Sequence, residues 1–153
     1  MGVSLSSSME DYLEAVAVLK EKDGVARVRD ISRLLHVEPP SVASALRNLS
    51  KSGLVIHERY GYVELTSKGE KVAENIGRRH KMLFEFLTEI LDIEPRVAQQ
   101  DACQMEHSVS SQTLQKITKF IEFVRGRPQA DKPDWLKGFD YYFRTGKRRR
   151  HKK

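Results

Sequence analysis

The sequence predicts a mainly α-helical protein with a small β-hairpin, in which a winged helix-turn-helix comes first and an all-helical half follows. Two observations support this fold class. Apolar residues recur at the i, i+3 and i+4 spacing of amphipathic helices over most of the chain. Between residues 54 and 65 the pattern changes to two short alternating stretches that are typical of β-strands. The length of 153 residues suits one ordinary domain or two small ones.

The first predicted helix follows the small, polar start MGVSLSSS and takes Ser8 as its N-cap. Its apolar residues follow helical spacing from Tyr12 to Leu19. Gly24 then ends the helix, because glycine is favoured just beyond a helix C-terminus.

A second, short helix opens at residues 27–30, and we expect it to bury Ile31, Leu34 and Leu35. The break His36-Val37-Glu38 separates it from a third helix. Two short helices with a break of three or four residues are the helix-turn-helix arrangement.

The third helix begins with Pro39-Pro40-Ser41, because proline suits the first turn of a helix, and it ends at residues 51–53. Residues 54–58 and 62–65 then alternate like strands and are joined by Arg59-Tyr60-Gly61. This hairpin is the wing of a winged helix-turn-helix.

The second half is predicted to be helical throughout. A long helix begins at the cap residues Thr66-Ser67 and continues to Leu91, and a break at residues 92–95 follows. A short helix contains the stretch ACQMEHS, and Ser110-Ser111 cap another whose pattern ends at Gly126. The remaining residues are aromatic in part but show no assignable pattern.

The formal charge of +6 comes from 27 Lys+Arg against 21 Asp+Glu, and its distribution is uneven. The last seven residues, KRRRHKK, contain six basic residues, so the whole excess lies in this tail. Such a run is attracted to polyanions, nucleic acid first. The alternative is a solvated end that only improves solubility.

The sequence shows no charged leader followed by an apolar core and no apolar run near the ~18 residues of a membrane span. The single cysteine excludes an internal disulfide, as is usual in a reducing compartment. We therefore expect a soluble, cytoplasmic protein with no membrane partner.

The third helix is the candidate recognition helix, because residues near the N-terminus of such a helix reach base edges in the major groove. Basic residues beside it and on the wing can contact phosphates, and Lys68 offers a further phosphate contact. The candidate DNA-binding residues are Arg27, Arg29, Pro39, Pro40, Ser41, Ser44, Arg47, Lys51, Arg59 and Tyr60. The alternative is a winged-helix module that binds only proteins.

The stretch ACQMEHS places Cys103, Glu106 and His107 on one face of a helix, so sulfur, oxygen and nitrogen donors converge. One helix cannot surround an ion, and further donors must come from elsewhere. The candidates are Asp11, Glu14 and His80. Taken separately, the two acids could be ordinary N-terminal helix residues favoured by the dipole, and His80 an ordinary histidine.

The chain resembles the metal-dependent repressors of the diphtheria toxin repressor and manganese transport regulator family. The resemblance covers about residues 9–125 and rests on MEDYLEAV, DISRLLHVEPPSVASALRNLSKSGLV, YVELTSKG, RRHKMLFEFL and CQMEHSVS. It implies a transcriptional repressor, not an enzyme: a homodimer that binds a divalent cation as corepressor and then a palindromic operator of metal-uptake genes. The expected domains are a DNA-binding domain over 1–72, a metal-binding and dimerisation domain over 73–140 and a basic tail over 141–153, without the SH3-like domain of longer members.

The resemblance also implies the ligand set. The family's metal ligands fall on Asp11, Glu14, His80, Cys103, Glu106 and His107. Asp11 is like the manganese branch, whereas Cys103 stands where the manganese-type prototype has glutamate and the iron branch cysteine. The ancillary site of the iron branch would need a carboxylate at 84 and a histidine at 99, but this chain has Phe84 and Gln99.

The donor chemistry favours Mn²⁺, with Zn²⁺ or Fe²⁺ as alternatives, because carboxylate and imidazole suit Mn²⁺ and Fe²⁺ while a thiolate shifts selectivity toward Fe²⁺, Co²⁺ or Zn²⁺. The expected mechanism is linkage: the metal fixes the DNA-binding module against the dimer core and thereby raises operator affinity. The candidate dimer-interface residues are Leu83, Leu87, Leu114, Ile117 and Ile121, with an intramolecular core as the alternative.

Two rival functions differ in class. A metallopeptidase of the H-x-x-E-H type needs two histidine ligands on the helix and a free glutamate base, and Cys103 in the first place disfavours it. A metal-independent winged-helix regulator would leave ACQMEHS as ordinary helix surface.

Overall fold

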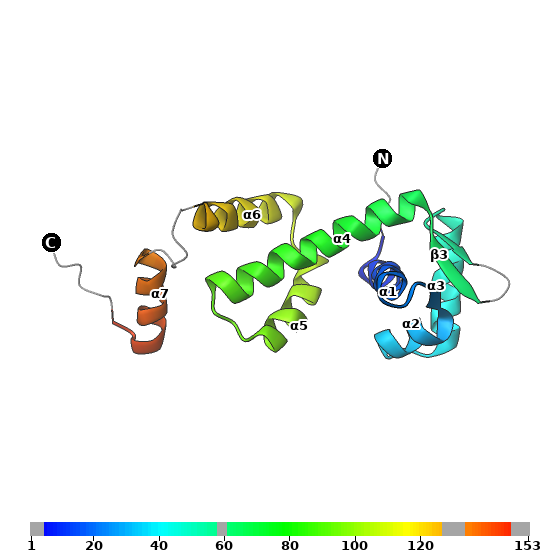
Figure 1. Ribbon diagram of the computed structural model, residues 1–153, viewed down its shortest axis with the longest axis horizontal. Helices are drawn as coiled ribbons and strands as arrows, with labels where there is room; N and C mark the ends of the chain where they lie inside the picture. The colour runs from blue at the N-terminus through cyan, green and yellow to red at the C-terminus, as the bar shows by residue number, and fades with distance from the viewer. Residues whose placement is uncertain (1–4, 58–60, 127–133, 148–153) are drawn as a thin grey trace. The chain divides into compact units, whose positions relative to one another are not determined.

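The computed structural model describes residues 5–57, 61–126 and 134–147. The chain divides into two compact units, Met1–Arg78 and Arg79–Lys153. The first unit contains α1 (Ser7–Asp23), β1 (Ala26–Arg27), α2 (Val28–Leu35), α3 (Pro39–Lys51), β2 (Val55–His57) and β3 (Tyr62–Leu65). The helix α4 (Ser67–Glu85) continues from the first unit into the second, which contains η1 (Phe86–Ile90), α5 (Pro95–Glu106), α6 (Ser111–Arg125) and α7 (Asp134–Thr145) (Figure 1). None of the helices within these ranges is long and apolar enough to cross a membrane.

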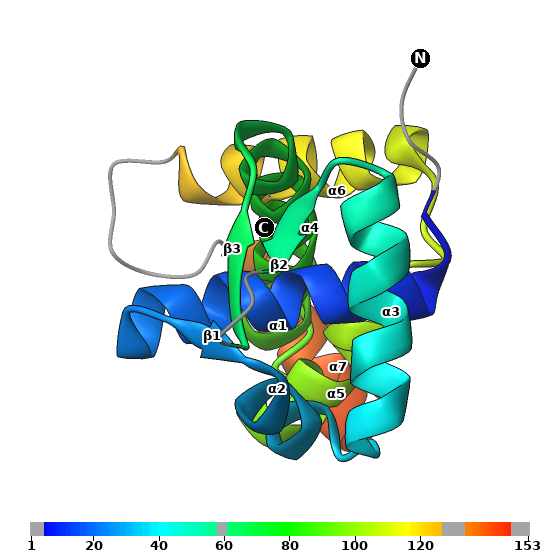
Figure 2. The same cartoon turned by 90° about the vertical axis from the view of Figure 1, so that its right-hand side faces the viewer.

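The first unit is a winged helix-turn-helix, as the sequence predicts. Its strands form an antiparallel sheet in the order β1-β3-β2 (Figure 2). Val63 of β3 lies opposite both Ala26 and His57. The short strand β1 was not predicted: Arg27 belongs to it, and α2 begins only at Val28. The core of this unit includes Leu13, Val16, Ile31, Leu46, Leu49, Leu54 and Ile76.

The helix α1 begins two residues earlier than predicted. Ser6 is the N-cap and its hydroxyl oxygen accepts a hydrogen bond from the Met9 amide at 3.4 Å, so Ser8 lies inside the helix. The end is as predicted, because Gly24 adopts a left-handed φ of 76° and its N–H donates to the Lys20 carbonyl.

The second helix differs from the prediction at two apolar positions. Ile31 is fully buried, but Leu35 is only partly buried against the core. Leu34 is 44% exposed, so the expectation that Leu34 is buried is wrong. The reason is helix geometry: with about 3.6 residues per turn, position 35 lies nearer than position 34 to the face of Ile31, so Leu35 packs against the core and Leu34 is turned toward solvent. His36 closes α2 in the left-handed region with φ of 54°.

The start of α4 is fixed tightly to the end of α3. The Thr66 hydroxyl donates to the Gly53 carbonyl at 2.7 Å and accepts from the Gly69 amide at 3.0 Å, so Thr66 caps α4 as predicted. A Cβ atom added at Gly69 would lie only 1.9 Å from the Leu54 carbonyl oxygen. Glycine is therefore required here by the close approach of two backbones.

The second unit has its own core around Leu83, Leu87, Ala98 and Ala102. The predicted long helix is continuous to residue 90, but its last turn, η1, is a π-helix, with the Leu91 amide donating to the Phe86 carbonyl at 3.3 Å. Such turns are rare and are often found near functional sites.

The residues without a sequence assignment include a helix, α7. Its Leu136 is 1% exposed, and the Trp135 ring lies 5.8 Å from that of Phe120 on α6. The Phe120 ring also lies 6.4 Å from that of Phe86. This aromatic chain links α7, α6 and η1.

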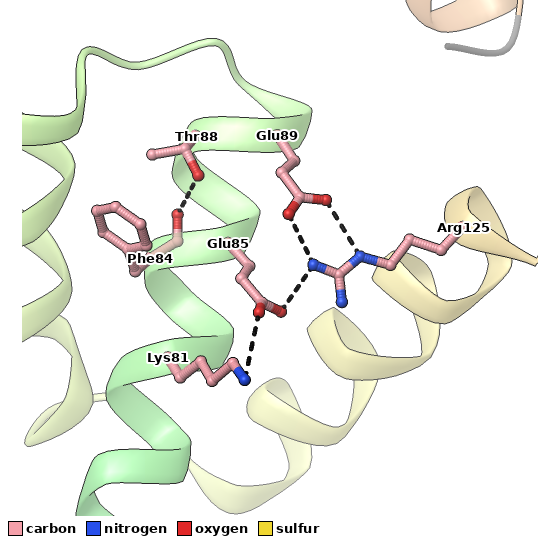
Figure 3. A network of polar contacts seen from close by, with 6 residues as sticks. All are labelled: Lys81, Phe84, Glu85, Thr88, Glu89 and Arg125. Atoms are coloured by element: carbon pink, nitrogen blue, oxygen red, sulfur yellow. Dashed lines mark hydrogen bonds and ion pairs between the residues drawn. The ribbon is translucent and has the colours of Figure 1, made fainter. Parts of the chain in front are cut away.

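A polar network joins α6 to η1 and to the end of α4 (Figure 3). Arg125 donates to both carboxylate oxygens of Glu89, at 2.6 and 3.1 Å, and lies 3.1 Å from Oε2 of Glu85. Lys81 Nζ lies 4.0 Å from the same Glu85 carboxylate. The hydrogen bonds to Glu89 and the nearby Glu85 carboxylate, opposed by partial burial, raise the pKa of Arg125 further above its ordinary value.

Candidate metal centre and DNA-binding surface

Three of the predicted ligands meet inside the second unit. Oε2 of Glu106, at the end of α5, lies 2.8 Å from Nδ1 of His80 on α4. Its other oxygen, Oε1, lies 3.5 Å from Nε2 of His107. The glutamate is therefore placed between two imidazole rings.

Glu106 is the one buried charged residue in the described part of the chain, at 1% exposure. Its Oε1 accepts no hydrogen bond from any described residue. A buried carboxylate with an unsatisfied oxygen is costly unless a cation neutralises it. A divalent ion that prefers oxygen and nitrogen ligands fits this need.

Cys103 and His107 form a second pair of donors on the same helix. The Cys103 sulfur and a ring nitrogen of His107 lie within 4.8 Å of each other. Glu106 contacts both histidines, so it links His80 to the pair formed by Cys103 and His107. Four of the predicted ligands therefore form one cluster within the second unit.

Gln99, which the sequence marks only as lacking the histidine of an iron-branch ancillary site, also belongs to this cluster. Its side-chain amide lies 2.9 Å from Nε2 of His80, on the ring edge opposite Glu106. The positions 99, 103 and 106 follow an i, i+4, i+7 pattern along α5, which places them on one helix face. That spacing is the signal that could have identified Gln99.

The two remaining predicted ligands, Asp11 and Glu14, lie in the first unit. They are one turn apart on α1, and each is partly buried. Their neighbours Tyr12, Leu13 and Ala15 are buried in the core of that unit. The six-residue ligand set as a whole stays a proposal, because its members belong to both units.

The predicted recognition helix exposes the expected face. Val42, Ala45, Leu46 and Leu49 of α3 are buried. The predicted contact residues of α3 are all exposed: Pro39, Pro40, Ser41, Ser44, Arg47 and Lys51. Arg29, on α2, is exposed as well. A hydroxyl-bearing and basic face is therefore available for phosphates and base edges.

Two of the basic residues predicted to contact DNA also have contacts within the protein. The Arg27 guanidinium donates to the Tyr62 hydroxyl at 3.3 Å and lies 5.0 Å from its ring centre, and this hydrogen bond raises the pKa of Arg27. Lys68 donates to the Ser52 carbonyl at 3.1 Å, so it ties α4 to α3. Arg59 and Tyr60, predicted for the wing, lie outside the described residues.

The predicted dimer residues differ in exposure. Leu83, Leu87 and Ile121 are buried within the second unit, whereas Leu114 and Ile117 are only partly buried. Leu114 and Ile117 therefore keep accessible surface on α6, whereas the other three side chains pack within the unit.

Comparison with known proteins agrees with the two-part organisation. Residues 4–63 match the family model for the N-terminal DNA binding domain of iron dependent repressors, and residues 66–133 match the model for their metal binding and dimerisation domain. The chain is 35% identical to the HTH-type transcriptional regulator MntR of Shouchella clausii over 118 residues, which are 77% of this chain and 82% of that protein.

Solved structures show the same fold. The manganese regulator SloR superposes with a TM-score of 0.67 and 27% identity, over 75% of this chain and 54% of that one. A manganese-dependent transcriptional repressor in complex with manganese gives a TM-score of 0.67 and 26% identity, over 82% and 60%. The chain thus spans little more than half the length of these solved relatives.

The helix-turn-helix with its wing, the buried carboxylate between two imidazoles and the matches over both halves lead to one conclusion. The chain belongs to the iron-dependent repressor family of metal-dependent transcriptional regulators.

Proposed function

We propose that this chain is a divalent-metal-dependent transcriptional repressor that acts in the cytoplasm as a homodimer and catalyses no reaction. In this proposal, metal loading favours a dimer geometry that binds a palindromic operator of metal-uptake genes. The observation that carries it is the Glu106 carboxylate, buried between His80 and His107 with one oxygen unsatisfied by the described residues.

The proposed ligands are Asp11, Glu14, His80, Cys103, Glu106 and His107. Support comes from their donor types and from the cluster that four of them form in the second unit. The bound ion supplies positive charge and a fixed coordination geometry. Asp11 and Glu14 contribute carboxylates from α1, whose apolar residues form part of the core of the DNA-binding unit.

Mn²⁺ is the favoured ion. Three of the six proposed ligands are carboxylates, two are imidazoles and one is a thiolate. Oxygen and nitrogen donors therefore dominate the set, and Mn²⁺ prefers such donors. The relatives named above as a manganese regulator and a manganese-dependent repressor support the same choice. The thiolate of Cys103 keeps Zn²⁺ and Fe²⁺ as alternatives.

The proposed mechanism is a coupling between ligand binding and DNA binding. The proposed metal ligands belong to α1 of the DNA-binding unit and to α4 and α5 of the second unit, and in this mechanism loading restrains one unit against the other. A symmetric dimer needs its recognition helices about 34 Å apart to read two half-sites one turn apart. A coupling of 1–3 kcal/mol, typical of such linkage, would raise operator affinity about 5- to 150-fold.

The test uses metal-stripped protein and a DNA duplex selected from a random library by the Mn²⁺-loaded protein. We would titrate binding with Mn²⁺, Fe²⁺ and Zn²⁺ in parallel at one fixed salt concentration, since affinities depend strongly on salt. Tighter binding with at least one ion is expected, together with palindromic sequence in the selected duplexes. Equal affinity with and without every ion would leave a metal-independent regulator.

A matched pair of variants separates the site from general charge effects. Glu106→Gln keeps the shape of the side chain but removes its charge, and it should abolish the metal response. Glu122→Gln removes an exposed carboxylate of α6 and should retain that response.

A further inference from the structure

We propose that Gln99 is a positioning residue for His80, which stabilises the ring both before and after metal loading by turning its carboxamide. This inference rests on the proposed function, because it concerns how one ligand of that metal site is prepared. It assigns to Gln99 a role that an exposed helix residue does not ordinarily have.

The two ring nitrogens of His80 face different partners. Nδ1 lies 2.8 Å from Oε2 of Glu106, and Nε2 lies 2.9 Å from the Nε2 of Gln99. A neutral imidazole carries one N–H and one lone pair. We assign the metal-free state to the tautomer with its proton on Nδ1, which donates to the Glu106 carboxylate while Nε2 accepts from the Gln99 amide.

Metal loading requires the opposite tautomer. An ion held by the Glu106 carboxylate and the facing edge of His80 needs the lone pair of Nδ1, so the proton must be on Nε2. The Nδ1 proton leaves to water and a water proton adds to Nε2, and the net charge of the ring does not change. Gln99 is exposed, so water can reach this edge of the ring.

A carboxamide serves both tautomers, since a half-turn of its terminal group exchanges the NH₂ donor for the carbonyl acceptor. Gln99 thus donates to Nε2 in one state and accepts from Nε2–H in the other. At position 99 a leucine would neither donate to nor accept from the ring, and an ionised glutamate could only accept. Partners of this kind orient a metal-bound histidine and typically change metal affinity by about 10- to 100-fold when removed.

The experiment reads the tautomer directly. Protein labelled with ¹⁵N-histidine is examined by long-range ¹H–¹⁵N NMR at one fixed pH, without metal and with diamagnetic Zn²⁺. The chain has five histidines, and a His80→Asn variant assigns the ring of interest. For the wild-type protein we expect the proton on Nδ1 without metal and on Nε2 with Zn²⁺.

Variants at position 99 should change both the tautomer and the affinity. Gln99→Leu should lower the affinity for Mn²⁺, measured by electron paramagnetic resonance of the free ion, by about tenfold or more. Gln99→Glu should place the proton on Nε2 even without metal. Gln100→Leu, at the neighbouring exposed glutamine of α5, is the matched control and should match the wild type in both measurements.

The inference fails if Gln99→Leu binds Mn²⁺ within twofold of the wild type with unchanged ring shifts, or if the metal-free wild-type ring is already protonated on Nε2. Failure of the proposed function looks different, because then the wild-type protein itself would bind neither Mn²⁺ nor Zn²⁺. Circular dichroism of each variant distinguishes loss of the helical fold from loss of the interaction.

Discussion

Glu106 and His80 form a 2.8 Å contact in which the carboxylate has no exposed surface and the imidazole is 16% exposed. We therefore expect Glu106→Gln to keep the stability of the metal-free protein but to lose the stabilisation by metal. In Glu106→Gln the amide can still accept from His80, so the metal-free free energy of unfolding should stay within about 1 kcal/mol of the wild type.

The metal response of the same variant should disappear. Wild-type protein at 100 times the dissociation constant for Mn²⁺ should gain about 2.7 kcal/mol of stability. Calorimetry with and without Mn²⁺ measures both quantities, with Glu122→Gln as the control that keeps the gain. A full metal-induced gain in Glu106→Gln would show that Glu106 is not a ligand.

Gly69 and Gly77, both on α4, should respond in opposite ways to alanine. The added Cβ at position 69 would meet the Leu54 carbonyl oxygen at 1.9 Å, whereas at position 77 it would meet nothing within 4 Å. Gly69→Ala should therefore lower the free energy of unfolding by about 2 kcal/mol or more. Gly77→Ala should raise it by about 0.5–1 kcal/mol, because alanine is the better helix former.

Urea unfolding followed by circular dichroism compares these two variants with the wild type. If Gly69→Ala were as stable as Gly77→Ala, the α4 backbone at position 69 would not lie as close to the Leu54 carbonyl as described.

Arg125 should contribute more to stability than other surface cations. It contacts Glu89 through two hydrogen bonds and also Glu85, whose side chain is only 14% exposed. Arg125→Gln should cost about 1 kcal/mol, at the upper end for exposed pairs, and the loss should shrink in high salt. Lys119→Gln, which breaks an exposed pair with Glu122, is the control and should cost less than half as much.

The pH dependence of this contribution follows from the raised pKa of Arg125. A cation whose folded-state pKa is raised adds stability that is fully present below its unfolded pKa and is lost only as the pH rises through the folded value. Arg125 therefore stays charged near neutrality. Thermal unfolding of Arg125→Gln between pH 6 and pH 9 should show a constant deficit, and a deficit that vanished by pH 9 would contradict this.

The sequence predicted the elements whose signals are local. The prolines at the start of α3, the glycine after α1 and the Ser110 cap of α6 each fix a boundary through backbone geometry, and each was found as predicted. The face of α5 that carries Cys103, Glu106 and His107 also follows from spacing alone.

The missed features depend on packing between distant residues. Leu34 is exposed because the core packs against the face of α2 that carries Ile31 and Leu35. The strand β1 forms by pairing with the distant strand β3. Helix α7 is stabilised by contact with α6, which no local pattern shows. The contact between the Gln99 amide and His80 joins two different helices, so the sequence around Gln99 could not predict it.

Arg47 should contact DNA without being needed for the fold, because it is exposed on the outward face of α3. Arg47→Ala should weaken binding to the selected duplex and reduce the dependence of log K on log salt by about 1, as expected for one phosphate contact. Arg33→Ala, on α2 and paired with Asp30, is the control and should leave the slope unchanged. An unchanged slope for Arg47→Ala would remove Arg47 from the interface.

The basic tail gives the last prediction. Residues 147–153 contain six Lys or Arg residues and carry the whole excess of positive charge. Each phosphate contact contributes about 0.9 to the slope of log K against log salt on B-DNA, so removing this run should lower the slope by as much as about 5. A variant in which these six residues are changed to serine keeps the chain length and isolates the charge. Because the tail contains no proposed metal ligand, its loss should weaken binding to all duplexes alike while the Mn²⁺-induced increase in affinity persists. Parallel salt plots for the serine variant and the wild type would mean that the tail does not touch DNA and serves solubility alone.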